Sequence, residues 1–432
     1  MKGDFSRLTF DATKHFSRVM MQQGRVQLDA DWNEQHAIFL HYLQTLTKDL
    51  IGEYGGPADN LGFKIITDIG DITNHRNLGI DEWKPLLKKC EGLLKDNIFI
   101  IGSGRYYVSG IQVTAEDYYG GFDQPDYPDQ KQVKLQAGTY LVYLDVWEHH
   151  ITSLEDASIR EVALENVDTA SRAKIVWQVK IIPLGKVATR DIAIQELKKL
   201  INKPRAYLTA DTSQKSTNSE PCTIAPESIY RGQENQLYRV EIYNTENNSP
   251  KIKWARDNAS LLTGAKLEGG SLTVNDPRGF KPGQWVEITN DEQELLEKSG
   301  QLIKIKSIDD NKFALEATII NTDLPNPKVR RWDGADIPAQ DIKPIPLADG
   351  VYINLKAANT TQGIGYRNGD YWLIPVRVAT GKVEWPDEPQ PPHGIEHHYA
   401  PLAVIEVNAA GAIAPPKDLR NQFKALAEPV SP

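Results

Sequence analysis

The sequence has only two cysteines, Cys90 and Cys222, among its 432 residues. Neither belongs to a Cys-x-x-Cys pair or a Cys/His cluster, so we expect no disulfide framework and no cysteine-based metal site. Such sparse cysteine favours a reducing compartment. The chain also has no basic stretch followed by an apolar run at its start, and no run of about 20 apolar residues. These features predict a cytoplasmic protein without a signal peptide or transmembrane segment.

Positive charge is scarce as well. The net charge is −9 and the pI is about 5.6. The densest basic run, KVRR at 328–331, is too short for a nucleic-acid-binding arm. Sequence-independent binding of nucleic acid needs a basic face, so we expect no nucleic-acid partner.

The short motifs of several enzyme classes are missing. The chain has no Gly-x-Gly-x-x-Gly, no phosphate-binding Gly-x-x-x-x-Gly-Lys-Ser/Thr and no Gly-x-Ser-x-Gly. Carboxylates are plentiful, but glycoside hydrolysis needs two of them at a defined separation, which a sequence does not give. We therefore expect a protein that is not an enzyme, with no catalytic residues and no cofactor.

The first 35 residues are unusually rich in apolar and aromatic groups for a chain terminus. Disordered termini are poor in aromatics, so this arm is predicted to become ordered by docking, on its own body or on a neighbouring subunit. We favour a neighbouring subunit. The residues expected to bind the partner are four aromatic anchors and three arginines that set the register: Phe5, Phe10, Phe16, Trp32, Arg7, Arg18 and Arg25.

The arm leads into the clearest helix of the chain, predicted over 29–52. Phe39, Leu43, Leu46 and Leu50 recur at spacings of four, three and four residues, which places them on one helical face. This pattern predicts a helix whose apolar face packs on a core and whose opposite face, with His36 and His41, is solvated.

Most of the remaining chain has the pattern of short strands. The apolar runs at 139–152 and 174–182 predict buried strands, and 81–94 is either a short helix or an irregular lobe. A train of short strands follows from 237 to 320, after a polar stretch at 202–236 that we interpret as an exposed loop. We expect a mainly β (α+β) fold of several small sandwich-like or barrel-like domains, with one N-terminal helix and few short helices.

The composition changes suggest four segments. They are an N-terminal arm and helix at 1–60, a β-rich domain with short helices at 61–235, a small barrel or sandwich at 236–330, and a C-terminal segment at 331–432 that completes the 61–235 domain.

Two polar clusters deserve an interpretation. The first comprises His393, Glu396, His397 and His398, which could ligate zinc or iron, although the prolines around it argue against a helix and favour a structural role. The second cluster comprises residues that we expect to brace turns: an Asp168–Arg172 pair, and the group Trp254, Arg256 and Asp257. Arg–Asp pairs beside tryptophan also occur in carbohydrate sites.

Four long blocks of the sequence are distinctive: the opening through WNEQ at 32–35, EVALENVDTASRAKIVWQVKI at 161–181, the stretch 237–291 with KIKWARDNAS and GQWVEITND, and the stretch 369–405 with PPHGIEHHYAPLAVI. These blocks resemble those of an uncharacterised bacterial family, the DUF6519-type proteins. The resemblance spans essentially the whole chain. It implies an accessory structural protein, associated with the baseplate of phage-tail-like contractile injection systems, and no catalytic residue.

The resemblance also implies the partners: other subunits of the injection particle, such as baseplate, sheath or tube components, in six-fold or other multiple-copy symmetry. The particle would be built in the cytoplasm and be either free or membrane-anchored. Two alternatives stay open on the residues alone. One is a fibre-like adhesin module that binds carbohydrate, and the weaker one is a cell-wall hydrolase.

Overall fold

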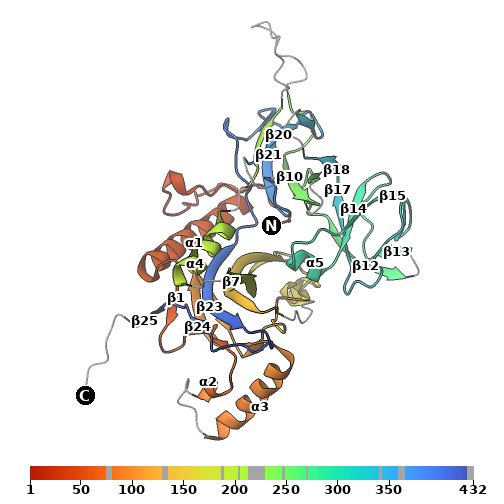
Figure 1. The fold of residues 1–432 in the computed structure, drawn as a ribbon. Helices are drawn as coiled ribbons and strands as arrows, with labels where there is room; N and C mark the ends of the chain where they lie inside the picture. Colours follow the sequence, from red (N-terminus) through yellow and green to blue (C-terminus); the bar gives the residue numbers. More distant parts are fainter. Residues whose placement is uncertain are drawn as a thin grey trace.

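The computed structural model describes residues 1–73, 80–128, 135–185, 189–202, 205–212, 229–245, 249–268, 271–339, 343–358 and 365–425. Strands hold 38% of the residues and helices 17%, in several small sheets and one six-stranded barrel, which confirms the mainly β fold class (Figure 1). Among the described helices, none is both long enough and apolar enough to cross a membrane. Cys222 lies outside the described residues.

The central sheet is built on the two strongest apolar runs of the sequence. Its order is β24-β23-β7-β8, with antiparallel pairing of β7 to both β8 and β23. The strands are β7 (Gly138–Ile151), β8 (Arg172–Pro183), β23 (His398–Val407) and β24 (Lys417–Asp418). Both predicted strands are therefore confirmed, and β7 lies between two neighbours, as a continuous apolar run favours.

Two smaller sheets pack against this central sheet and share its largest core. One has the order β25-β1-β4-β5 and the other β2-β3-β6. In the core, the Phe63 ring meets the Trp177 ring edge to face, with their centroids 5.1 Å apart. The strands are β1 (Tyr54–Pro57), β2 (Ile65–Ile66), β3 (Ile100–Ile101), β4 (Gly104–Val108), β5 (Ile111–Ala115), β6 (Tyr119–Gly120) and β25 (Gln422–Phe423).

Few helices accompany these sheets, and α4 packs beside β23 (Figure 1). The stretch 81–94 is helical, within α3. The helices are α1 (Asp29–Ile51), α2 (Gly70–Thr73), α3 (Ile80–Asp96), α4 (Arg190–Ile201) and α5 (Asp291–Leu295), with 3-10 turns at Ala12–Lys14, Ala157–Ile159 and Val162–Leu164.

A second unit joins a sheet of order β18-β11-β10-β21-β22 to one of order β19-β20-β9, around its own core. The strands are β9 (Tyr207–Asp211), β10 (Gln236–Tyr243), β11 (Lys251–Ala255), β18 (Gly334–Pro338), β19 (Ile345–Pro346), β20 (Tyr352–Lys356), β21 (Tyr371–Arg377) and β22 (Lys382–Val383). The expected loop at 202–236 thus contains a strand. Leu208 is fully buried because β9 pairs with β20, far away in sequence.

The third unit is the closed barrel, on the right in Figure 1. Its strands are β12 (Leu262–Glu268), β13 (Ser271–Val274), β14 (Trp285–Thr289), β15 (Gln301–Asp309), β16 (Lys312–Leu315) and β17 (Lys328–Trp332). Within the predicted 236–330 segment, β10 and β11 belong to the second unit instead. Within 331–432, β21 joins the second unit and β23 the central sheet.

Helix α1 packs on the body mainly through polar and small side chains, together with Ile38. Of its residues, Ala30 and Ile38 are buried. The helix comes very close to the β4–β5 turn, where a Cβ on Gly110 would lie 2.2 Å from the carbonyl oxygen of Gln44. Gly110 also has a φ of +82°, which side-chain-bearing residues rarely adopt.

We expect Gly110→Ala to lower the free energy of unfolding by about 1–3 kcal/mol, because it adds both a backbone clash and a strained φ. Chemical denaturation followed by far-UV circular dichroism measures the change. Gly92→Ala is the matched control: Gly92 lies in α3 with nothing within 4 Å of the added methyl, so alanine should be neutral or stabilising. Equal losses in both variants would contradict the assigned contact.

Candidate functional site

The first residues of the chain are inserted into the body, beside β10 and β21. The ammonium group of Met1 donates to the Tyr371 hydroxyl at 2.8 Å. Arg239 Nη1 donates to the carbonyl oxygen of Met1 at 3.2 Å, and Asn258 Nδ2 donates to that of Gly3 at 2.8 Å. The body therefore recognises the main chain of this segment as it would a bound peptide.

Lys2 enters a buried network of charges. Its ammonium lies 3.4 Å from a Glu241 carboxylate oxygen. Lys253 Nζ lies 3.1 Å from Glu241 and 2.6 Å from Glu287, and the three side chains Lys253, Glu241 and Glu287 are almost completely buried. Burial by itself would raise the pKa of Glu241, but Lys2 and Lys253 outweigh it and hold that pKa below its ordinary value. The network joins β11, β10 and barrel strand β14 to the N-terminal segment.

Phe5 closes the segment with apolar contacts. It packs against Leu237, Tyr371 and Leu373, and its ring meets the edge of His150 at a centroid distance of 6.0 Å. Residues 6–10 then run along α1: the Ser6 amide donates to Asp29 at 2.9 Å, the Thr9 hydroxyl donates to Glu34 at 2.5 Å, and the Phe10 ring contacts His41. We call residues 1–10 the anchor segment.

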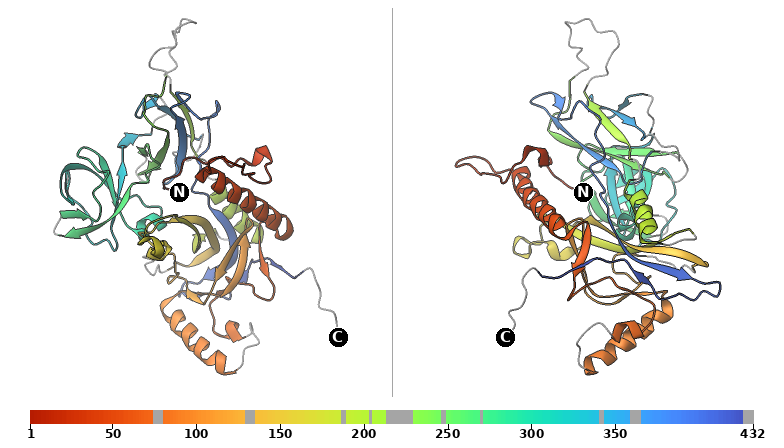
Figure 2. Two further views of the ribbon diagram at one scale, coloured as in Figure 1. Left: turned by 180° about the vertical axis from the view of Figure 1, so that it is seen from behind. Right: turned by 60° about the vertical axis from the view of Figure 1, so that its left-hand side comes forward.

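Residues 11–28, which we call the linker, contact the body far less. Val19 is partly buried and its amide donates to Gln35 on α1 at 2.8 Å, while the other linker residues are exposed. In Figure 2 this dark red part of the chain loops out beside α1. Three of the residues predicted to bind a partner lie in the linker and are exposed: Phe16, Arg18 and Arg25. A fourth, Arg7, belongs to the anchor segment, and its Nη1 atom lies 3.7 Å from a carboxylate oxygen of Glu384.

The apolar face of α1 is exposed, contrary to the prediction that it packs on a core. Phe39, Leu43, Leu46 and Leu50 are between 57% and 69% exposed, and Trp32 is 69% exposed. The reason is that the opposite side of the helix, with its smaller and polar groups, makes the close approach at Gly110. We call these five residues the outer face. Thirteen of the 21 large exposed apolar residues in the described chain lie between residues 8 and 50.

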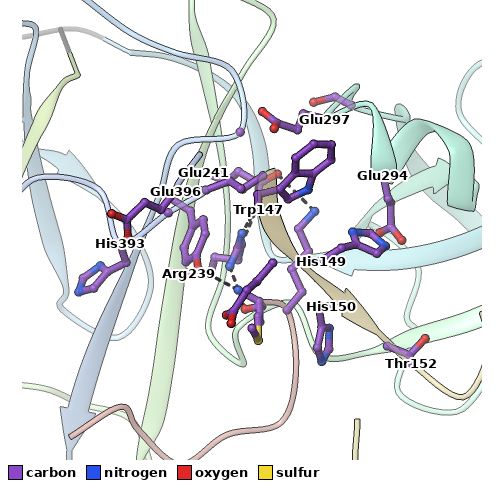
Figure 3. Close-up of a pocket in the computed structure, with 18 of the residues that line it drawn as sticks. Trp147, His149, His150, Thr152, Arg239, Glu241, Glu294, Glu297, His393 and Glu396 are labelled. Carbon is purple, nitrogen blue, oxygen red and sulfur yellow. Dashed lines mark hydrogen bonds and ion pairs between the residues drawn. The ribbon is translucent and has the colours of Figure 1, made fainter. Parts of the chain in front are cut away.

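A cavity of about 500 Å³ lies beside the anchor segment, between the central sheet, the second unit and the barrel (Figure 3). Most charged groups in its wall already have partners, such as Glu294 with Arg330 at 2.9 Å. The Nε2 atom of His150 and the hydroxyl of Thr152 are buried without a hydrogen-bond partner. Burial, aided by the nearby terminal ammonium and Arg330, lowers the pKa of His150 to about 3, so this imidazole is neutral at ordinary pH.

The cluster predicted at 393–398 is drawn apart by its partners. His397 Nδ1 lies 2.7 Å from Asp145 on β7, and its Nε2 makes a very short contact with Glu297, just after α5. His393 Nδ1 accepts from the Leu373 amide at 3.2 Å. His393, Glu396 and His398 all line the cavity, whereas His397 is held apart from them by Asp145 and Glu297.

In the described chain, only one group of acidic or imidazole side chains has metal-like spacing, and it is Glu155, Asp291 and Glu294. The Lys328 ammonium lies 2.9 Å from Glu294 and 3.6 Å from Glu155, and it also pairs with Asp291. A side-chain cation therefore already neutralises this group.

The predicted bracing residues all have partners, but not always the expected ones. Asp168 accepts from Ser153, while Arg172 donates to the carbonyls of Ala170 and Ser171, so the predicted Asp168–Arg172 pair is not formed. In the other group, Trp254 stacks on Tyr238, Arg256 pairs with Asp333 and Asp349, and Asp257 pairs with Arg331.

The sequence matches the model of a family of unknown function, DUF6519, over residues 1–205, 184–264 and 270–411. The chain belongs to this family. No curated protein and no solved structure matches it.

The site residues that the sequence did not reveal are the receiving groups in the body of this DUF6519 protein: Arg239, Glu241, Asn258 and Tyr371. Asn258 lies in the KIKWARDNAS block. The Met1 and Gly3 carbonyl oxygens to which it donates are more than 250 residues away in sequence. Local patterns carry no information about such distant pairs. A usable signal was the placing of charged side chains inside strands, such as Glu241 in LYRVEIYN.

We expect Lys253→Met to lower the free energy of unfolding by about 4 kcal/mol, because Glu241 and Glu287 would be left buried without their shared counter-charge. Equilibrium denaturation measures the loss. Lys198→Met, an exposed lysine on α4, is the matched control and should change stability by less than about 0.5 kcal/mol. A small effect at Lys253 would mean that the network is hydrated.

His397 predicts a dependence of stability on pH. Burial would lower its pKa, but Asp145 and Glu297 outweigh burial and raise that pKa above its ordinary 6.5. A raised folded-state pKa gives stability that is complete below pH 6.5 and is lost as pH rises through the folded value. Denaturation midpoints from pH 5.5 to 9 should therefore fall, and the fall should be smaller in His397→Gln.

The control for this titration is His36→Gln, a change at an exposed residue of α1, which should keep the wild-type dependence. Asp145 and Glu297 predict how stability changes at acidic pH. Burial would raise their pKa values, but His397 lowers the pKa of Asp145 below 3.8 and that of Glu297 below 4.5. The stability that the two carboxylates contribute is therefore lost as pH falls through the lowered values. If the denaturation midpoint of His397→Gln fell with rising pH as steeply as that of the natural chain, His397 would be excluded as the group that causes the fall.

Proposed function

We propose that this chain is a structural, non-enzymatic subunit of a phage-tail-like contractile injection system, at its baseplate or baseplate periphery, which assembles by protein–protein contacts. The observation that carries the assembly role is the exposed outer face of α1. Soluble monomers rarely leave large contiguous apolar patches in water, and patches of this kind mark interaction sites. The identity of the particle rests on the four sequence blocks that resemble such proteins.

The outer face has the chemistry of an interface core rather than of an ordinary surface. Trp32, Phe39, Leu43, Leu46 and Leu50 follow one another along α1 at helical spacing. Burying each such side chain contributes about 1.5–3 kcal/mol, so the five together offer on the order of 10 kcal/mol before the costs of association. Trp is also among the residues enriched at the energetic centre of interfaces.

The partners that fit this proposal are other subunits of the particle: baseplate, sheath or tube components in six-fold or other multiple-copy arrangement. Assembly would take place in the cytoplasm, in a particle that is free or membrane-anchored. A role as a carbohydrate-binding module is less well supported, because Trp254, Trp332 and Trp372 are buried and cannot offer a ring face to a sugar.

We expect the double change Leu43→Glu, Leu46→Glu to abolish co-sedimentation with particles purified from cells that carry the gene, because each glutamate would have to be desolvated in the interface. Co-sedimentation at fixed stoichiometry, measured by quantitative mass spectrometry, is the readout. The far-UV spectrum and the thermal midpoint should stay unchanged, since both leucines are exposed in the free chain.

The matched control is Ile320→Glu, which places a charge on an even more exposed apolar residue (87% exposed) after barrel strand β16. It should leave co-sedimentation intact. A wild-type chain that stays monomeric, never joins particles and binds purified glycans would support the adhesin alternative instead. Turnover of peptidoglycan that is lost in carboxylate variants would support the hydrolase.

A further inference from the structure

We propose that the anchor segment is exchanged between copies of this chain, so that residues 1–10 of one copy occupy the cleft beside β10 and β21 of a second copy. The proposal rests on the proposed function, which it deepens by naming a second copy as the partner and the cleft as the binding site. In the free chain described above, the same cleft is filled by the chain's own segment.

The cleft recognises the segment through contacts that do not depend on which chain supplies it. Arg239 and Asn258 donate to main-chain carbonyls of residues 1 and 3, Lys2 reaches Glu241, and Phe5 fills an apolar site formed with Leu237 and Leu373. A segment from a second copy would make identical contacts. Exchange of an identical element is therefore a low-cost route to association.

The linker has the length and the exposure that exchange requires. Its 18 residues can span roughly 60 Å when extended. Among the described residues, two hydrogen bonds tie residues 11–28 to α1: the Val19 amide donates to Gln35, and the Trp32 amide donates to the Leu28 carbonyl where the helix begins. Moving the linker away from its own body therefore breaks few contacts. A linker that served only to lead the chain into α1 would not need apolar groups, yet Phe16, Met20 and Val26 are exposed.

Exchange would also bring two copies of α1 within one linker length of each other. Three residues of the anchor segment contact α1: Ser6 bonds to Asp29, Thr9 bonds to Glu34, and Phe10 packs on His41. An exchanged segment would make these contacts with α1 of the neighbouring copy. The linker then runs between two copies of α1. In that position its apolar side chains and the outer face can be buried against each other, which supplies a gain that the unexchanged chain lacks.

The test is photo-crosslinking in the full-length chain. A chain with a benzoyl-phenylalanine in place of Phe5 is co-expressed with a second chain of natural sequence that carries a C-terminal affinity tag. After irradiation, exchange predicts a covalent product of two chains that is retained on the tag and attached within β10 or β21 of the tagged chain. Attachment found only within the photoreactive chain would overturn the proposal.

The same photoreactive residue in place of Ile320 is the control, and it should give no attachment to β10 or β21. A cysteine lock provides an independent measurement: with Cys90 and Cys222 replaced by alanine, Phe5→Cys and Leu373→Cys in one chain should oxidise to a bond that holds the segment in its own cleft. Exchange predicts that light scattering finds a monomer when the lock is formed in the unassembled chain and a larger species after reduction and equilibration.

These results separate the two proposals. Particles that retain the locked chain at normal stoichiometry would overturn exchange while leaving the structural role intact. A chain that never joins particles, locked or unlocked, would overturn the structural role itself.

Discussion

The shared ammonium of Lys253 is the interaction on which the rest of this structure depends. It is almost fully buried between Glu241 on β10 and Glu287 on β14, and those strands belong to different units. A buried charge is tolerated only when it is paired with good geometry, so the second unit and the barrel have essentially one relative position that satisfies it. The Trp332 side chain adds to this constraint, because its indole N–H donates to Glu287 at 2.8 Å and its ring lies under Lys253.

His397 applies the same kind of constraint between the central sheet and the segment that follows α5. Its two ring nitrogens face Asp145 on the central sheet and Glu297 beyond α5, and Trp147 and Tyr399 stack near the ring. Lys180 and Arg367 approach the two carboxylates in turn. All three units are therefore joined by buried charges rather than by one continuous apolar core. Such joints fix orientation more than they add stability, which is consistent with the proposed role as a structural subunit.

The sequence predicted the elements well and their partners poorly. The β7 run and the β8 run are long, apolar and β-branched, and α1 has a clear helical period, so local signals were sufficient for all three. The pairing of Asp145 with a residue 252 positions later has no local signal. The strand β9 was missed because the stretch around it is polar, and its stability comes from β20. The orientation of α1 was predicted wrongly, because periodicity identifies an apolar face but not what covers it. In the structure the polar side of α1 packs against the turn at Gly110, and the apolar side is exposed.

The way the anchor segment is held bears on its proposed role in assembly. Burial lowers the pKa of Lys2 despite the nearby Glu241 carboxylate, so the network only partly compensates the desolvation of this ammonium. The contacts of Phe5 and the main-chain hydrogen bonds therefore have to offset that cost. The proposed exchange requires a segment that is ordered in the free chain and can leave its own body during assembly. The exposed linker and the outer face lie next to it, so release of the segment and burial of apolar surface can occur in one step.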